Sequence, residues 1–198
     1  SKSHPVSASP SRTTMRIKLA ILAAVMIGLA AGAHAQTDPA AKEAPAPIVV
    51  SKSVQLLTGD TWRDGDRLYR LYGVQACLRG TAATDGNGKK DDCGDLSLAH
   101  LAALFSTTTV TCQPIGYAID KATFVVCAAD LDGNTIDVGT ALISTGYAFA
   151  AMNTKGEAVS TNYLVAEINA KMEHDGLWAT TFQHPVQLLL KQAQERKK

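Results

Sequence analysis

The sequence lacks the short motifs that assign a chemistry on their own. It has no CxxC pair, so neither a zinc site nor a thiol redox centre has support from the sequence. It has no GxSxG elbow, which argues against a serine hydrolase. It also lacks a basic excess: 19 basic residues stand against 18 acidic ones, whereas a protein that binds a phosphate backbone usually carries a basic stripe. The function therefore has to be inferred from longer patterns.

A run long enough to span a membrane is missing as well. The apolar stretch LAILAAVMIGLAA has 13 residues, whereas a spanning helix needs about 20. Arg16 and Lys18 precede this stretch, and the small-residue pattern AHA ends at Ala35. These features predict a secretory signal peptide over residues 1–35, with residues 1–14 upstream of its start. We expect the mature protein to be periplasmic or secreted, with no stable membrane span.

Export changes the charge balance. Cleavage after residue 35 removes four basic residues and no acids, which leaves 15 basic and 18 acidic residues and a net charge of about −3. This balance argues against tight nucleic-acid binding. The C-terminal segment KQAQERKK is the exception, and we expect residues 186–198 to form a basic, solvated tail.

Composition divides the mature chain into a linker and one domain. Residues 36–48, QTDPAAKEAPAPI, are rich in Pro and Ala and have no hydrophobic periodicity, which predicts an extended linker. Residues 49–185 are long enough for one domain with a single core. Within them, Asp64-Gly65 predicts a hairpin turn between two strands, and TTVTCQPI and ATFVVCAA predict a second hairpin.

Helical spacing of apolar residues follows each hairpin region. LSLAHLAALFST predicts a helix with Asp95 as its N-cap, and a small helix is predicted within TIDVGTALISTGYAFA. NYLVAEINAKMEHDG predicts an amphipathic helix with Leu164, Ile168 and Met172 on one face. This order indicates an α+β, mainly β fold: a five-stranded OB-type β-barrel with about three peripheral helices. A general α+β fold is the alternative.

The other polar segments are better explained as turns and surface loops than as metal-binding or catalytic sites. The glycine-rich segment RGTAATDGNGKKDDCGD predicts a surface loop, because its acids at residues 85–92 lack the spacing and the distal glutamate of a calcium loop. DLDGN at residues 130–134 is explained by a hairpin turn. His100 and His174 have no partner at ligand spacing, so we expect surface or cap roles for them.

Five segments carry a family resemblance. In order, TGDTW…RLYRLYGV, CGDLSLAHLAALF, VTCQP, VVCAADLDGNTIDVGTALISTGYAFA and YLVAEINAKMEHDGLWATTFQ resemble the thermonuclease (staphylococcal nuclease-like) family, and in particular exported bacterial members with extra cysteines. The resemblance covers residues 54–183, nearly all of the mature domain. It implies a domain related to enzymes that cleave phosphodiester bonds with a calcium ion, carboxylates, a general base and arginines.

Two charged positions of that site are retained. The family's DGDT is TGDT here, so the resemblance places Asp60 at a calcium-ligand position, with Thr58 in place of the first acid. Arg70 in YRLYG matches the first phosphate-binding arginine.

Three other positions are replaced by uncharged residues. The family's RLxGIDxPE is RLYGVQACL here, so Gln75 stands at a calcium-ligating aspartate and Leu78 at the glutamate base. Ala122 falls at the second arginine; Lys121 beside it would point to the other face of a strand. Gln75 brings no charge to a hard cation, and Leu78 accepts no proton.

The four cysteines predict two disulfides in an exported chain, with three possible pairings. Cys112 and Cys127 flank a polar tip near Ile119 and would be directly opposite in a hairpin, at a separation that suits a bridge. Cys77–Cys93 would then close the long loop, and it would replace a catalytic corner with a structural one.

These observations lead to two hypotheses. The first is a catalytically degenerate thermonuclease-like domain that acts as a binding module, with no cofactor, for a partner that is a nucleic acid, a polysaccharide or an envelope protein. The alternative is a working calcium-dependent endonuclease that uses Asp60, Arg70 and unidentified replacement groups.

Overall fold

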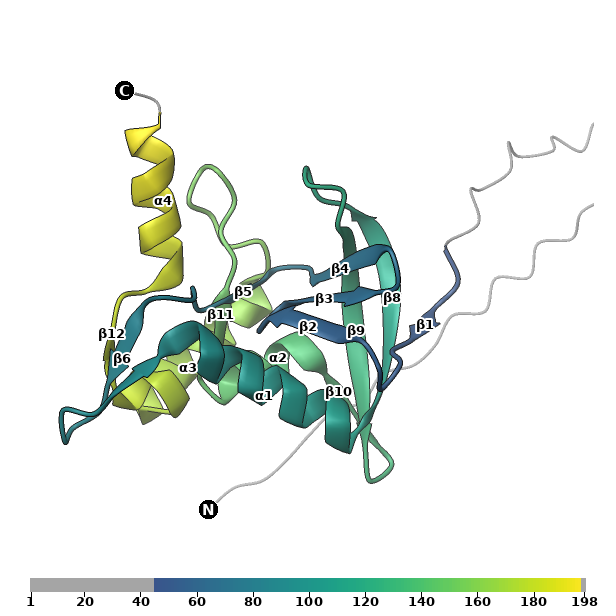
Figure 1. Cartoon of the computed structure of the whole chain (residues 1–198), viewed down its shortest axis with the longest axis horizontal. Coiled ribbons are helices and arrows are strands. Elements are labelled where there is room, and N and C mark those ends of the chain that lie inside the picture. The colour runs from purple at the N-terminus through teal and green to yellow at the C-terminus, as the bar shows by residue number, and fades with distance from the viewer. Residues whose placement is uncertain (1–44, 197–198) are drawn as a thin grey trace, which may run out of the picture. The chain divides into compact units, whose positions relative to one another are not determined.

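The computed structural model describes residues 45–196. The predicted signal peptide and most of the predicted linker lie outside this range. Strands dominate the described residues and four α-helices accompany them, which confirms the α+β, mainly β prediction (Figure 1). Within residues 45–196, none of the helices combines the length and the apolar character needed to cross a bilayer.

The largest sheet has seven strands in the order β1-β8-β9-β4-β3-β2, with β10 beside β9. Its pairs are antiparallel except for β4 and β9, which run parallel. The strands are β1 (Ile48–Val49), β2 (Gln55–Thr58), β3 (Thr61–Asp64), β4 (Arg67–Leu71), β8 (Thr109–Tyr117), β9 (Thr123–Leu131) and β10 (Asn134–Asp137). Among the described residues the end strands β1 and β2 do not pair, so a closed barrel is not shown.

Both predicted hairpins are confirmed. β3 and β4 meet at Gly65, whose positive φ of 56° suits the turn. β8 and β9 pair with Cys112 directly opposite Cys127. In Figure 1 the long strands of this hairpin run across the direction of β2, β3 and β4, and one end of the hairpin rises beside β4.

The remaining strands form two small sheets, and the second of these contradicts a prediction. β5 (Val74–Ala76) pairs with β11 (Ala148–Ala150). β6 (Ala82–Thr84) pairs with β7 (Lys90–Asp92) and with β12 (Thr181–Phe182). The segment that we predicted as a surface loop is thus largely a hairpin, because a strand from the C-terminal region, remote in sequence, pairs with it.

The helix that follows begins earlier than predicted. α1 (Cys93–Thr107) is capped by Asp92, whose carboxylate accepts a hydrogen bond from the Asp95 backbone N–H at 3.0 Å. Asp95, the predicted cap, lies in the first turn instead. The helix extends to Cys93 because this residue and its disulfide partner are buried, which fixes the first turn against the domain.

Of the apolar face predicted for the later helix, Leu164 packs against the core but the other two residues do not. α2 (Val138–Ser144) packs against α3 (Thr161–Glu173). On α3, Ile168 and Met172 are exposed, while the buried residues are Tyr163, Ala166, Glu167 and Ala170. The reason is steric: Gly139 on α2 leaves room for the Tyr163 ring, and the Tyr163 hydroxyl donates to Asp137 at 3.2 Å.

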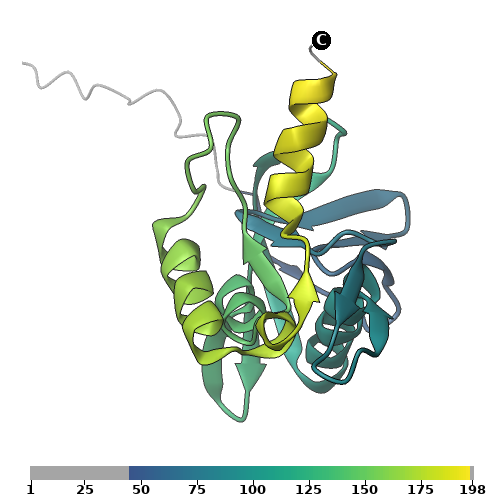
Figure 2. The same ribbon diagram turned by 90° about the vertical axis from the view of Figure 1, so that its left-hand side faces the viewer.

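The predicted C-terminal tail contains a fourth helix, one more than expected. α4 (Pro185–Glu195) follows a short 3-10 turn, η1 (Gly176–Ala179), and β12. Pro185 and Val186 are buried, and the remainder of α4 projects away from the sheets (Figures 1 and 2). Proline at the first helical position has the φ that a helix needs and no N–H to leave unpaired, which explains where α4 begins.

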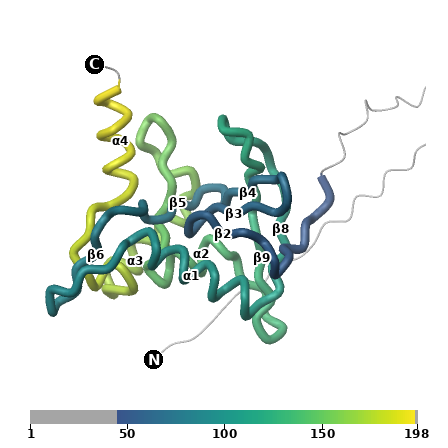
Figure 3. Tube along the Cα trace, viewed as in Figure 1, coloured from purple at the N-terminus to yellow at the C-terminus, as the bar shows by residue number. Residues whose placement is uncertain are grey.

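The core has two apolar clusters. In the larger one Trp62 stacks on Tyr69, with ring centroids 5.8 Å apart, and meets Phe105 edge-on at 5.1 Å. The smaller one surrounds the buried Cys77 and Cys93. The trace in Figure 3 shows β6, α3 and α4 towards one end and the β8–β9 hairpin at the other.

We predict that Gly146→Ala destabilises the fold far more than Gly133→Ala. Both glycines have φ near +80°, but a Cβ on Gly146 would lie 2.1 Å from the Asp175 carbonyl oxygen, whereas nothing lies within 4 Å of one on Gly133. In urea unfolding, Gly133→Ala should lower the free energy of unfolding by about 1 kcal/mol, because alanine is strained at a positive φ. Gly146→Ala should lower it by at least about twice as much. Equal decreases for the two variants would show that the backbone at Gly146 is not in close contact with Asp175.

Candidate functional site

Asp60 lies in the turn between β2 and β3, and its carboxylate is buried. One oxygen, Oδ1, accepts hydrogen bonds from the hydroxyls of Thr58 at 2.6 Å and Thr61 at 2.8 Å. The other, Oδ2, accepts from the backbone N–H of Ala76 at 2.8 Å. Asp60 therefore connects the β2–β3 turn to β5, and Thr58 serves that connection as a donor.

Arg70 continues the same chain of contacts towards the β8–β9 tip. Its Nε donates to the Thr61 hydroxyl at 3.2 Å, and its Nη2 pairs with the Asp120 carboxylate at 2.7 Å. The hydrogen bond from Arg70 lowers the pKa of Asp120 below its ordinary value. A lowered pKa means that this pair stabilises the fold above the ordinary aspartate pKa and is lost as the pH falls through the lowered one. Because Asp120 is half exposed, the contribution is small.

Gln75 and Leu78 contribute neither charge nor a proton acceptor beside Asp60. Gln75 lies on β5, is partly buried, and its amide donates to the backbone carbonyl of Ala76 at 2.9 Å. Leu78 follows β5 and is also partly buried. Neither residue makes a hydrogen bond to Asp60 within the described part of the chain.

Ala122 lies at the foot of the β8–β9 tip and is completely buried. Its backbone N–H donates to Asp120 Oδ1 at 3.2 Å, and its carbonyl accepts from Ala118 at 2.8 Å. The neighbouring Lys121 is exposed and has a positive φ of 65°. A guanidinium would not fit at position 122 without movement of the tip, so Ala122 acts there as a packing residue.

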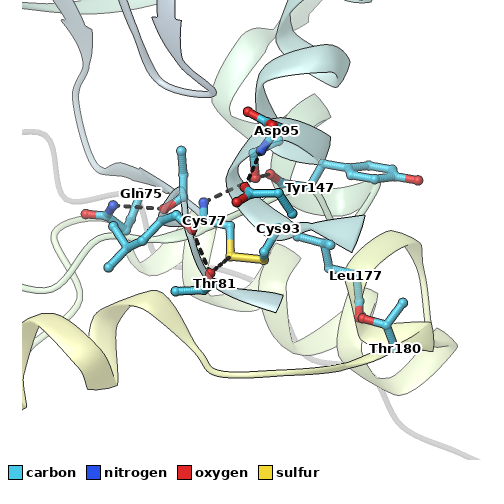
Figure 4. The surroundings of a disulfide bond; sticks show 12 residues. Gln75, Cys77, Thr81, Cys93, Asp95, Tyr147, Leu177 and Thr180 are labelled. Carbon is cyan, nitrogen blue, oxygen red and sulfur yellow. Dashed lines mark hydrogen bonds between the residues drawn. A yellow bond between two sulfur atoms is a disulfide. The ribbon is translucent and has the colours of Figure 1, made fainter. Parts of the chain in front are cut away.

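Both predicted disulfides are confirmed. Cys77–Cys93 joins the end of β5 to the start of α1 across a Cα–Cα distance of 5.6 Å, and Cys112–Cys127 joins β8 to β9 across 4.0 Å. Figure 4 shows the Cys77–Cys93 bridge surrounded by polar contacts. The Cys77 N–H donates to the Ser97 hydroxyl at 3.1 Å, and that hydroxyl donates to the Tyr147 carbonyl at 2.6 Å. The corner that precedes Leu78 is thus held by a covalent and hydrogen-bonded frame.

A calcium ion takes six to eight oxygen ligands and depends on carboxylate charge. The matched positions offer one carboxylate, on Asp60, and its oxygens already accept three hydrogen bonds. This donor set does not fit calcium. Throughout residues 45–196, no group of three or more His, Cys, Asp or Glu side chains is arranged to hold a metal ion.

The remaining polar candidates have local roles. Asp85 accepts hydrogen bonds from the Asn87 and Lys89 N–H groups, and Asp130 accepts from Gly133, so both acids form turns. His174 is the left-handed C-cap of α3, as expected. His100 stacks on Tyr147 and bonds Thr145 at 2.9 Å; burial lowers its pKa.

One buried polar pair was not predicted from the sequence. Glu167 on α3 accepts from the Ala150 N–H at 2.6 Å and pairs with His184 Nε2 at 3.0 Å. Both side chains are nearly buried, with exposures of 11% and 16%. The two residues are separated by 17 positions and a 3-10 turn, so no sequence spacing signals the contact.

Comparison with known proteins does not identify a family for this chain. No model of a known protein family matches the chain, and no curated protein matches it.

We predict that Asp60→Ala lowers the free energy of unfolding by about 2–3 kcal/mol, because it leaves the buried Ala76 N–H and two hydroxyls without an acceptor. The matched control Asp66→Ala, in the exposed β3–β4 turn, should change it by less than about 0.5 kcal/mol. Chemical denaturation of both variants without added metal measures the difference. If Asp60 served only to bind a ligand, Asp60→Ala would leave the free energy of unfolding unchanged or raise it.

Proposed function

We propose that this chain is an exported, thermonuclease-like domain of the OB type that does not cleave phosphodiesters and acts as a binding module. The observation that carries the proposal is the Asp60 carboxylate, whose two oxygens are engaged by three donors of the domain itself. A carboxylate in that state supports the fold instead of holding a cation.

The chain order supports the OB-type assignment. β2, β3 and β4 form an antiparallel meander; after the short strands β5, β6 and β7 of the small sheets come α1 and then the β8–β9 hairpin. The second strand of that hairpin returns to lie parallel to β4. A three-stranded meander, a helix and a hairpin that packs back on the meander is the order of an OB-type barrel, which can be partly open.

The replaced residues support the loss of catalysis. Leu78 accepts no proton, and removal of a general base costs about 10²–10⁴ in rate. Ala122 supplies no charge to a phosphate, and removal of one such stabilising group costs about 10²–10³. The remaining cation, Arg70, is paired with Asp120. Although such losses are not additive, their combination leaves no group at the matched positions to activate water.

Exposed side chains near the β8–β9 tip are the proposed binding surface. Tyr117 is 80% exposed, Ile119 is fully exposed and Tyr72 on the β4 side is 41% exposed. Of these three residues, Tyr117 also lines a cavity of about 660 Å³, together with Arg67 and Tyr69. Aromatic and aliphatic residues of this kind favour a protein partner, and a mature charge near −3 disfavours a phosphate backbone. We therefore favour an envelope protein over a nucleic acid or a polysaccharide.

The proposed location is the periplasm or the medium outside the cell. Two disulfides close within this one domain, and both are buried. Such bridges form and persist in oxidising compartments.

We predict that the purified mature protein leaves supercoiled plasmid and single-stranded DNA intact, with calcium and with a chelator alike. Gel electrophoresis after prolonged incubation at high protein concentration measures this, with a calcium-dependent nuclease in parallel as the positive control. Chelator-sensitive cleavage would overturn the proposal and restore the endonuclease alternative. To exclude a contaminant, the cleaving activity should co-elute with the protein, vanish in Asp60→Ala and persist in the Asp66→Ala control.

We also predict that a photo-crosslinking residue in place of Tyr117 forms a discrete protein adduct in intact cells. The same residue in place of Met172, which is 69% exposed on α3, should not give this adduct. Ile119→Asp should weaken adduct formation because it places a charge in the apolar surface. Loss of the adduct on nuclease treatment would indicate a nucleic acid partner, and loss on glycosidase treatment a polysaccharide; either result contradicts the choice of a protein.

A further inference from the structure

A cavity between α4, η1 and β12 is lined by neither Asp60, Arg70 nor the residues of the β8–β9 tip. Its volume is about 570 Å³, within the range of about 300–1,000 Å³ that small-molecule sites occupy. We call it the α4 pocket; it is lined chiefly by Trp178, Phe182, Gln183, His184, Gln187 and Lys191.

One side of α4 faces this pocket. His184 precedes the helix, and Gln187, Leu188 and Lys191 follow it at intervals of three, four and seven residues. These intervals place side chains on the same helical face. The first turn of α4 is fixed because Pro185 and Val186 are buried and His184 pairs with Glu167. The pocket is thus built on an anchored helix.

The opposite side of the pocket is an aromatic wall. Trp178 meets Phe182 at a centroid distance of 5.2 Å and an angle of 69°, and it lies 5.7 Å from the His184 ring. Phe149, which is completely buried, supports Trp178 from 5.5 Å. The contacts between these rings hold the wall in place and offer an apolar surface to a ring of a ligand.

Lys191 is the one permanently charged side chain among the described residues that line the pocket, and Gln183 and Gln187 are neutral amides that can donate or accept hydrogen bonds. Within the described residues, Lys191 makes no ion pair, and the amides of Gln183 and Gln187 make no side-chain hydrogen bond. No Asp or Glu is among the described residues that line the pocket. The nearby Glu167 is directed to His184 and to the Ala150 N–H, and its side chain is only 11% exposed.

This combination selects a class of ligand. Aromatic walls can bind organic cations, but Lys191 opposes a cation here. A carboxylate, in contrast, would accept charge-assisted hydrogen bonds from Lys191 and further bonds from an amide. We propose that the α4 pocket binds a small organic carboxylate with an attached ring, the ring against Trp178 and Phe182 and the carboxylate at Lys191 and Gln187. This proposal goes beyond the binding surface at the β8–β9 tip and does not depend on it.

The test uses phenylacetate as the probe and phenylacetamide as its neutral isostere. The chain has two tryptophans, and Trp62 lies in the other core cluster, so the two indole N–H signals in a ¹⁵N–¹H NMR spectrum provide a reporter and an internal reference. Phenylacetate should shift the Trp178 signal saturably and leave Trp62 unchanged. Phenylacetamide should bind at least about tenfold more weakly, because it cannot form the charge-assisted bond.

Lys191→Gln and Lys171→Gln form a matched pair of variants. Lys191 is exposed and lines the pocket, whereas Lys171 lies over the Trp178 ring at 5.4 Å and does not line it. Lys191→Gln should weaken phenylacetate about tenfold without affecting phenylacetamide, and Lys171→Gln should leave the phenylacetate affinity unchanged.

Three results would overturn the proposal: no saturable shift of Trp178 up to about 10 mM phenylacetate, equal binding of the two probes, or an equal effect of the two variants. Unchanged unfolding curves for both variants would show that a loss of affinity is local.

Discussion

The buried Asp60 carboxylate is the interaction on which the rest of the domain depends. It accepts hydrogen bonds from Thr58 and Thr61 at the β2–β3 turn and from Ala76 on β5, so it joins two sheets that do not otherwise pair. A buried carboxylate without partners would be costly, and three donors remove that cost. Thr61 also accepts from Arg70, which pairs with Asp120, and the network therefore extends to the β8–β9 tip. In a catalytic site the same charges would have to face a ligand. Here Asp60 is bonded to uncharged donors of the domain, and Arg70 is paired with Asp120.

Covalent and steric constraints stabilise the neighbouring corner. The Cys77–Cys93 bridge joins the end of β5 to α1, and Ser97 bonds both the Cys77 N–H and the Tyr147 carbonyl. A Cβ on Gly59 would lie 2.6 Å from the Ser97 Cβ, so the turn that carries Asp60 packs directly on α1. A site that needed to open for a ligand would gain little from such a frame. A rigid frame does suit a domain that presents a fixed surface, such as the exposed hairpin tip with Tyr117 and Ile119.

Local signals predicted much of the fold, and long-range contacts account for the errors. The turn at Gly65 and the pairing of Cys112 with Cys127 follow from residues close in sequence, and both are confirmed. The strands β6 and β7 were missed because part of their pairing comes from β12, about 100 residues later. On α3, apolarity alone favoured Ile168 and Met172, but these are exposed, whereas Tyr163 and the small Ala166 and Ala170 are buried. Packing shape prevailed over hydrophobicity there.

The sequence by itself determined that residues 78 and 122 supply neither a charge nor a proton acceptor, because Leu78 and Ala122 have no ionisable group in any conformation. It also determined that four cysteines could form two bridges. Only the tertiary structure decided what the retained charges do: Asp60 and Arg70 could have faced solvent, and they are instead bonded to Ala76 and Asp120, which are remote in sequence. The same holds for Glu167 and His184, whose contact fixes the start of α4. Hydrogen-bond partners depend on distances between chain segments, and those distances exist only in the folded domain.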